Sequence, residues 1–442
     1  MSNARQRRRQ SRKTKLSGNG KIFIQIASYR DPLLESTVQD AIDKADKPEN
    51  LVFSICRQFH PDDKFDTLDK WRGDSRFRIL DVDWEKAKGV CWARWSVQQQ
   101  YQGEEYTLQI DSHHRFVKGW DTISIDMLKG LQKDGYEKPL LTGYIPSFDP
   151  DNDPEGRAKE PWEMTFDRFI PEGAVFFLPQ AIKDWKTRKK PVRARFYSAH
   201  FAFTLGQFSV EVQHDPDYYF HGEEISIAVR AYTHGYDLFY PHKIIAWHEY
   251  TRKGRSKHWD DSKGWGKLNK ECHQRNRALF GMDGEPPRKD DKYGFGTVRT
   301  LRDYEKYAGI HFKKRAIQQW TEEHKEPPNP EVYDTEEEWE GSFLRIFKHC
   351  IDVGYKRVPL DDYDFWCVVY KDKDGKDLHR QDAGPREIER MKNDPDGYCK
   401  VWRKFLADEK NPPVSYIVWP HSKSKGWQEQ IKGTLRNTAV VS

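Results

Sequence analysis

The sequence predicts an α/β fold followed by a smaller C-terminal α+β domain. Residues 21–27 and 51–56 are apolar runs, as found in strands that are buried on both faces of a parallel sheet. Residues 33–45, between these runs, carry apolar side chains at helical spacing. Strand, helix and strand together predict a β-α-β unit of a Rossmann-like domain. No G-x-G-x-x-G motif follows the first strand, which argues against a dinucleotide-binding fold.

Length and composition predict two domains. The chain has 442 residues, more than one ordinary core organises, and 14% of them are aromatic, so ample apolar surface can be buried. A proline-rich stretch at residues 326–330 marks the junction. We therefore expect a first domain at residues 20–315 and an accessory domain at residues 330–442.

The accessory domain is expected to contain β-hairpins and one or two helices. Asp374-Gly375 separates two strand-like segments, which is a hairpin signal, and residues 414–419 predict a further strand. The domain has no residues at catalytic spacing. Buttressing the first domain is the role we expect, with acceptor recognition or self-association as alternatives; the sequence does not fix the oligomeric state.

Charge and cysteine content narrow the class of protein. The net charge of +5 is too small over this length to imply nucleic-acid binding by itself. Residues 1–19 form a basic tail that we expect to be disordered, and that can touch DNA, an acidic partner or an anionic surface. The six cysteines include no C-x-x-C pair and predict free thiols. No signal peptide or long apolar segment is present, so we expect a cytoplasmic protein without a membrane partner.

The most informative stretch is Asp111-Ser112-His113, which follows the strand-like residues 108–110. Side chains alternate along an extended chain, so Asp111 and His113 are expected on the same side. A carboxylate and an imidazole together suit Mn²⁺ better than Mg²⁺, which prefers oxygen ligands. An isolated Asp-x-His is also compatible with an exposed polar turn.

Other polar residues follow predicted strands or lie in predicted helices near them. Ligands of open α/β sheets bind beyond the carboxyl ends of strands, so Ser28, Arg30 and Asp31 are expected near a nucleotide. A salt bridge at a helix start is the alternative for Arg30 and Asp31. A third strand at residues 77–83 leads to a predicted helix at residues 88–101, which carries Arg94.

A helix is predicted after His221-Gly222. Apolar residues recur at helical spacing, Glu223 and Glu224 occupy the first turn, and Gly235 stands where a helix ends. The helix dipole explains both acidic residues, at about 1 kcal/mol each at most. Contact of one of them with a substrate is the functional alternative.

A third candidate ligand follows the extended residues 244–247. His248 ends this segment and is followed by a basic run that includes Arg252, Lys253 and Arg255. A single histidine after a strand is usually structural. Beside a cationic loop, and together with the upstream Asp-x-His, His248 is a better candidate for a metal ligand.

Taken in order, these stretches resemble the GT-A family of cytoplasmic N-acetylglucosaminyltransferases that glycosylate hydroxyproline on a Skp-type ubiquitin-ligase subunit. They are more distantly similar to the polypeptide N-acetylgalactosaminyltransferases. The resemblance covers about residues 20–312 and rests on residues 26–31, Lys88-Gly89 with Arg94, residues 109–113, residues 222–225, Trp247-His248 and residues 293–300.

The resemblance implies retaining transfer from a UDP-sugar with a divalent cation, Mn²⁺ or Mg²⁺. The expected donor is UDP-N-acetylglucosamine, and the expected acceptor is a hydroxyl group of a protein. On this model the metal ligands are Asp111, His113 and His248. The nucleotide pocket contains Ser28, Arg30, Asp31 and Arg94. Glu223 or Glu224 contacts the sugar or the acceptor, and Asp111, His113, Glu223 and Glu224 form the catalytic set. His114 and Arg115 depart from the family pattern.

Physical chemistry is consistent with this layout. Cleavage of the sugar–UDP bond develops negative charge on the β-phosphate, which the metal and Arg252, Lys253 or Arg255 stabilise. In a front-face retaining displacement the departing phosphate accepts the proton of the acceptor, so no strong base is needed. A double displacement instead needs a carboxylate nucleophile. Two alternatives remain: the same chemistry on a hydroxylated DNA base, and a non-catalytic module that binds a sugar nucleotide or glycan.

Overall fold

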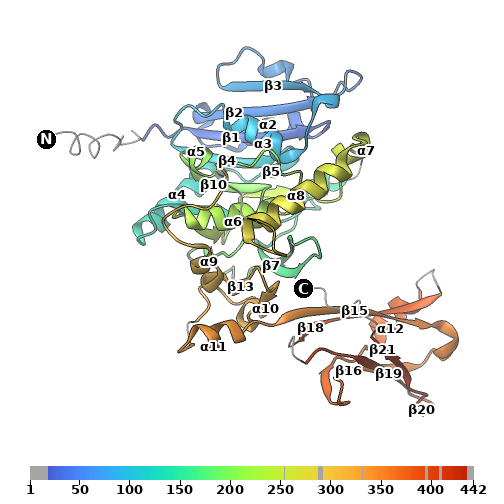
Figure 1. Ribbon diagram of the computed structural model, residues 1–442. Coiled ribbons are helices and arrows are strands. Elements are labelled where there is room, and N and C mark those ends of the chain that lie inside the picture. Colours follow the sequence, from blue (N-terminus) through green and yellow to red (C-terminus); the bar gives the residue numbers. More distant parts are fainter. Residues whose placement is uncertain are drawn as a thin grey trace. The chain divides into compact units, whose positions relative to one another are not determined.

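The computed structural model describes residues 18–252, 254–286, 292–330, 332–393, 397–407 and 411–435. Nearly all of the predicted basic tail, and Lys253, lie outside these residues. The chain divides into two compact units (Figure 1). The first comprises Met1–Thr165, Leu178–Leu279 and Pro286–Tyr304, and the second comprises Phe166–Phe177, Phe280–Glu285 and Glu305–Ser442.

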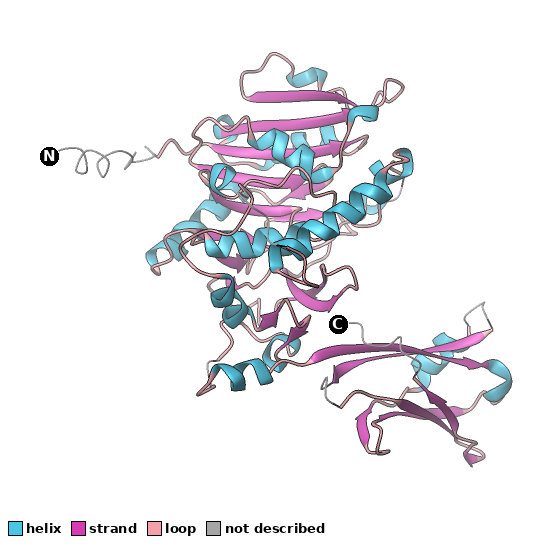
Figure 2. Cartoon of the chain, viewed as in Figure 1, coloured by secondary structure: helices cyan, strands magenta, loops and turns pink. Residues whose placement is uncertain are grey.

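The first unit is built on an eight-stranded sheet in the order β3-β2-β1-β4-β10-β6-β11-β9 (Figures 1 and 2). Neighbours β1, β2, β3 and β4 are parallel, as are β6 and β11, whereas β10 and β9 are antiparallel to their neighbours. The strands are β1 (Ile22–Tyr29), β2 (Leu51–Phe59), β3 (Phe77–Asp83), β4 (Tyr106–Asp111), β6 (Pro139–Thr142), β9 (Val192–Arg193), β10 (Phe201–Leu205) and β11 (Asp237–Tyr240). The predicted α/β class is confirmed.

Helices cover both faces of this sheet, which explains the continuous apolar runs. On one face, Ile24 and Ile26 of β1 share a core with Val38 of α2 (Leu34–Lys44). On the other, Cys56 of β2 packs with Val97 of α3 (Val90–Gln98). Because both faces of such a parallel strand are buried, its apolar side chains do not alternate with polar ones.

A short ribbon next to the sheet brings distant segments together. Strand β5 (His114–Phe116) pairs antiparallel with β12 (Ala246–His248), and His248 lies opposite His114. The other helices and strands assigned wholly or mainly to this unit are α4 (Trp120–Lys133), β8 (Val175–Ala181), α5 (Phe208–Glu211), α6 (Glu223–Thr233), α7 (His258–Asp261) and α8 (Trp265–Phe280). Strand β7 (Trp162–Phe169) and helix α9 (Leu301–Ala308) are divided equally between the two units. Short 3-10 turns occur at Pro48–Asn50, Asp69–Trp71, Trp84–Lys86 and Pro150–Asn152.

The second unit has its own core of strands and a helix. Strand β15 (Arg345–Gly354) pairs with β18 (Tyr398–Ala407), and the second sheet contains β16 (Tyr363–Lys371), β17 (Asp377–Arg380), β19 (Ser415–Ser422), β20 (Gly426–Trp427) and β21 (Ile431–Thr434). Trp366, Val368 and Val401 are buried in one cluster with Ile388 of α12 (Pro385–Lys392). The remaining elements are β13 (Ile310–His311), β14 (Ala316–Ile317), α10 (Gln319–Glu322), α11 (Glu336–Gly341) and the 3-10 turn Tyr355–Arg357.

Several local predictions are confirmed. The predicted hairpin forms between β16 and β17, with Gly375 at a φ of +80°. All six cysteines are free thiols, and five of them are buried. Within the described residues, no helix combines the length and the apolar character that crossing a membrane requires.

Candidate active site

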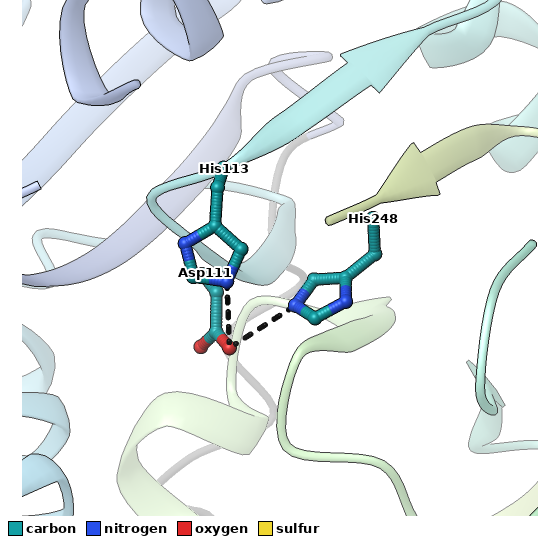
Figure 3. A group of neighbouring side chains, drawn as sticks. All are labelled: Asp111, His113 and His248. Carbon is teal, nitrogen blue, oxygen red and sulfur yellow. Dashed lines mark ion pairs between the residues drawn. The ribbon is translucent and has the colours of Figure 1, made fainter. Parts of the chain in front are cut away.

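Three side chains from two strand ends converge in the first unit (Figure 3). Asp111 ends β4, and His248 ends β12. The Nε2 atoms of His113 and His248 lie 3.7 and 3.4 Å from Oδ2 of Asp111. One donor atom from each of the three residues lies within 4.8 Å of the other two, so the three residues could hold one metal ion. The structure thus brings together the three residues predicted as metal ligands.

The local geometry differs from the simple alternation expected of a strand. Residues 112 and 113 form a bend between β4 and β5, and both side chains turn toward Asp31. Ser112 Oγ donates to Asp31 Oδ2 at 2.7 Å, and His113 Nδ1 lies 2.8 Å from the same oxygen. With Nδ1 bound to Asp31, the Nε2 atom of His113 faces Asp111. Carboxylate–histidine pairs of this kind fix the orientation of metal-ligating imidazoles.

Asp31 is a buried carboxylate with several donors. Besides Ser112 and His113, it accepts from the backbone N–H of Leu33 at 2.9 Å and from Nη1 of Arg255 at 2.9 Å. Burial alone would raise the pKa of Asp31, but the hydrogen bond and charge of His113, together with Arg255, lower it to about 2. Asp31 therefore stays ionised and acts on His113, although it also lines the cleft described below.

A second buried network orients Asp111. Arg94 of α3 donates from Nη2 to Asp111 Oδ1 at 2.6 Å and from Nη1 to both oxygens of Glu223 at 2.7 and 2.8 Å. Nδ1 of His214 lies 2.6 Å from the other side of Glu223. Burial would raise the pKa of Glu223, but Arg94 and His214 lower it to about 2. Arg94 thus occupies one oxygen of Asp111 and leaves Oδ2 toward the imidazoles.

His248 has the properties of an available ligand. It is buried, and neither ring nitrogen has a hydrogen-bond partner among the described residues. Burial, opposed only in part by Asp111, lowers the pKa of His248 well below its usual range. The imidazole is therefore neutral, which is the form that binds metals. Asp111 keeps 23% of its side chain exposed, so the cluster is open to the cleft. These residues fit a divalent cation.

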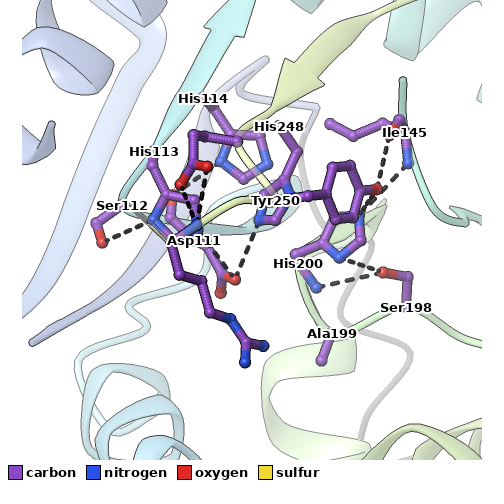
Figure 4. Close-up of polar contacts among 12 residues, drawn as sticks. Asp111, Ser112, His113, His114, Ile145, Ser198, Ala199, His200, His248 and Tyr250 are labelled. Carbon is purple, nitrogen blue, oxygen red and sulfur yellow. Dashed lines mark hydrogen bonds and ion pairs between the residues drawn. The ribbon is translucent and has the colours of Figure 1, made fainter. Parts of the chain in front are cut away.

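Further aromatic groups pack behind His248 (Figure 4). The ring of His200 stacks on that of His248 with centroids 4.2 Å apart. Nε2 of His200 lies 3.1 Å from the hydroxyl of Tyr250, which donates to the carbonyl of Ile145 at 2.7 Å. His114, which departs from the family pattern, is fully buried, and burial lowers its pKa well below the usual range. Neither His200 nor Tyr250 has a sequence signal that marks this role.

A cleft opens beside the three candidate ligands. Its walls include cations and aromatic rings from segments far apart in the chain: Tyr29, Tyr219, Phe220, Tyr250, Arg252, Arg255, Lys257 and Trp259. Arg255 contacts both ring nitrogens of His113 and pairs with Glu249 at 3.2 Å. Glu249 also accepts from the backbone N–H of Arg252 at 3.0 Å. Glu249 therefore anchors the basic loop over the cleft, a role that sequence reasoning missed.

The other residues predicted to contact the nucleotide are Ser28, Arg30 and Arg94, and both arginines pair with carboxylates of the protein. Ser28 is fully buried near the end of β1, and Arg30 pairs with Asp63 at 2.7 Å and Asp261 at 3.0 Å. Neither residue, nor Arg94, lines the cleft. The salt-bridge alternative for Arg30 thus describes its contacts in the structure, although its partners are Asp63 and Asp261 rather than Asp31.

The two acidic residues of α6 have different surroundings. Glu223 is fully engaged by Arg94 and His214. Glu224 is half-buried, accepting from the hydroxyl of Tyr144 at 3.1 Å and the backbone N–H of Ala199 at 3.0 Å. Burial raises the pKa of Glu224 to about 7, and the charge of Glu223 adds to this effect. The partners of Glu223 are charged or titratable, whereas those of Glu224 are a hydroxyl and a backbone N–H, and neither glutamate lines the cleft.

Comparisons with known proteins identify the family. The model of the family described as Glycosyltransferase (GlcNAc) matches residues 21–70 and 64–314. No curated protein matches the chain. Among solved structures, GalNAc-T7 with UDP, GalNAc and Mn²⁺ aligns at a TM-score of 0.44 and 12% identity, covering 94% of this chain and 72% of that one. TarS 1-349 of S. aureus with UDP-GlcNAc aligns at a TM-score of 0.35 and 13% identity, covering 62% and 68%.

The family match covers the sheet and the cluster of Asp111, His113 and His248. It extends over well more than half of the chain. The predicted α/β fold is confirmed, and the matched family is one of glycosyltransferases. The chain belongs to the Glycosyltransferase (GlcNAc) family and is a glycosyltransferase.

Proposed function

We propose that this glycosyltransferase moves N-acetylglucosamine from UDP to a hydroxyl group of a protein, with retention and with a divalent cation at Asp111, His113 and His248. The observation that carries the proposal is this cluster, whose donor atoms lie within 4.8 Å of one another beside a cationic cleft. Membership of the Glycosyltransferase (GlcNAc) family is consistent with an N-acetylglucosamine donor.

The residues present suit Mn²⁺, because one carboxylate and two imidazoles favour a borderline metal over Mg²⁺. When bound, the cation would neutralise charge that develops on the departing diphosphate. Asp111 supplies an oxygen, and His113 and His248 supply nitrogens. Asp31 and Arg94 are positioning residues, since each acts on a ligand through a direct hydrogen bond.

The basic loop supplies the second source of positive charge. Arg252 and Arg255 line the cleft together with Lys257, and Glu249 anchors the loop through Arg255 and the backbone of Arg252. Preorganised cations stabilise a leaving phosphate without reorganisation during the reaction. Lys253 is assigned to this loop from the sequence alone. For Ser28 and Arg30 we propose support of the strand end rather than contact with the nucleotide.

Glu224, rather than Glu223, is the residue we propose to face the sugar or the acceptor. Both oxygens of Glu223 are committed to Arg94 and His214, whereas Glu224 is half-buried and has a pKa of about 7. A front-face displacement needs no nucleophilic carboxylate, and a double displacement does. Glu224→Gln therefore separates the two routes: retained kcat favours front-face transfer, and loss of kcat, together with a covalent sugar adduct detected on Glu224 of the native protein, favours double displacement.

The acceptor and domain roles follow from the sequence resemblance. We propose a hydroxyproline, serine or threonine acceptor, residues 20–315 as the catalytic domain and residues 330–442 as a buttress, in a cytoplasmic protein. The DNA alternative rests on the basic tail, which lies outside the described residues, so no structural observation favours it. No structural observation favours a glycan-binding module without activity either, because such a module would not need all three candidate metal ligands.

Transfer assays test this function directly. The protein is incubated with Mn²⁺ and UDP-N-acetylglucosamine or UDP-N-acetylgalactosamine, and with hydroxyproline, serine and threonine peptides or hydroxymethylated DNA. Transfer of N-acetylglucosamine to a peptide with the α-anomeric configuration of the donor, read by NMR, is the expected result. Transfer only to DNA, inversion of the anomeric centre, or equal activity in a chelator would each contradict the proposal.

A further inference from the structure

A second cavity lies in the first unit and shares no lining residue with the cleft. Ile123, Met127 and Leu131 of α4 form its apolar side. The opposite side comes from the chain before β9 and the turn after β11, which contributes His242 and Lys243. Nothing in the glycosyl-transfer site described above uses this cavity.

Positive charge dominates the rim of the cavity. Lys133, Lys189 and Lys243 are exposed and make no hydrogen bond or ion pair with any described residue. Lys190 pairs with Asp134 at 2.8 Å, so these two charges cancel. Asp126 is the one further carboxylate in the lining. Three ammonium groups against one carboxylate leave an excess of positive charge around a concave surface.

A buried polar side chain lies within this lining. His242 is 4% exposed, and its Nδ1 atom has no hydrogen-bond partner among the described residues. Burial, and then the charges of Lys243 and Arg188, lower the pKa of His242 to about 4. A buried donor or acceptor without a partner is unfavourable, and a ligand bound at that atom would recover part of the cost.

We propose that this cavity binds a phosphate dianion, either as free phosphate or as a phosphoryl group on a peptide. Phosphate carries more charge and more acceptor oxygens than a carboxylate, so it can engage several ammonium groups and the imidazole together. Lysine ammonium groups bind phosphate as point charges. The proposal is independent of the identity of the sugar donor and of the acceptor.

The test is calorimetric titration of the whole protein with inorganic phosphate at low ionic strength, where surface charges are least screened. Lys133→Gln and Lys243→Gln remove cavity charges. Lys129→Gln is the matched control, because Lys129 is exposed on the same helix α4 but does not line the cavity. Arg255→Gln reports phosphate that binds in the cleft instead. All four substitutions are on the protein surface or in a loop, and circular dichroism verifies folding.

The expected result is one saturable phosphate per chain, with affinity reduced about three- to tenfold in each cavity variant. Lys129→Gln and Arg255→Gln should leave this affinity unchanged. Equal weakening by Lys129→Gln and Lys133→Gln, loss in Arg255→Gln, or no saturable binding at millimolar phosphate would overturn the proposal. A phosphoserine peptide that binds more tightly than phosphate, with no binding of its unmodified counterpart, identifies the source as a phosphorylated chain; otherwise free phosphate is the source.

Discussion

At the scale of single residues, Asp31 determines how His113 is presented. Its carboxylate lies 2.8 Å from Nδ1, which leaves Nε2 on the side of Asp111. Asp31→Asn keeps the size but removes the charge, and should weaken Mn²⁺-dependent UDP binding by about 10–100-fold. Calorimetry checks this loss. Asp63→Asn, a carboxylate that pairs with Arg30 and does not line the cleft, is the control and should have little effect. Equal affinity of Asp31→Asn and the native protein would refute the positioning role.

Glu224 makes a prediction about pH. Its pKa is raised to about 7, above the ordinary value of 4.5, so its contribution to stability is complete below the ordinary value and is lost as pH rises through about 7. Relative to Glu224→Gln, the native protein should therefore lose about 2 kcal/mol of its free energy of unfolding between pH 5 and pH 7.5. Urea unfolding at both pH values measures it. A difference independent of pH would mean that Glu224 titrates normally.

The candidate metal ligands could be predicted from the sequence, whereas the side chains that hold them in place could not. Asp111, His113 and His248 follow strand-like segments, and the structure does bring them together. The contacts of Arg94 were not predictable, because Glu223 lies 129 positions away in the chain and Asp111 lies 17. Such pairings depend on how α3 and α6 pack, and no local pattern encodes that.

At the scale of elements, Gly222 limits how α6 can begin. Its φ is +91°, and a Cβ there would lie 2.9 Å from Oδ1 and 3.0 Å from Cγ of Asn276. Gly222→Ala should therefore lower the free energy of unfolding by about 1–3 kcal/mol. Gly130→Ala in α4 is the matched control: it has open space and a helical φ, and should be neutral or stabilising by up to about 1 kcal/mol. Denaturant unfolding compares the two, and equal effects would contradict the role of Gly222.

Elements with a strong period were predicted well, and short ones were not. Strand β3 occupies Phe77–Asp83 as predicted, and α2 and α6 match their apolar spacing. Strands β10 and β9, which run antiparallel inside and at the edge of the sheet, were missed. Five and two residues are too few to show a period, and their direction is set by their neighbours.

At the scale of the whole molecule, the two units have separate cores. Val368 is fully buried in the second unit, in a cluster that shares no residue with the main core of the sheet. Val368→Ala should destabilise the second unit by about 2 kcal/mol. If residues 330–442 only buttress the enzyme, Mn²⁺-dependent UDP binding at a temperature below the transition should stay unchanged. Calorimetric scanning and titration measure both effects, and loss of UDP binding would assign the second unit a part in the site.

The central claim is that Asp111, His113 and His248 hold the cation through which UDP binds. Its most direct test is calorimetric titration of UDP with and without Mn²⁺ for the native protein, Asp111→Ala and His248→Ala. We expect binding that requires Mn²⁺ in the native protein and loses that requirement, together with most of its affinity, in both variants. UDP binding of equal strength without Mn²⁺, or undiminished Mn²⁺-dependent binding in both variants, would contradict the account.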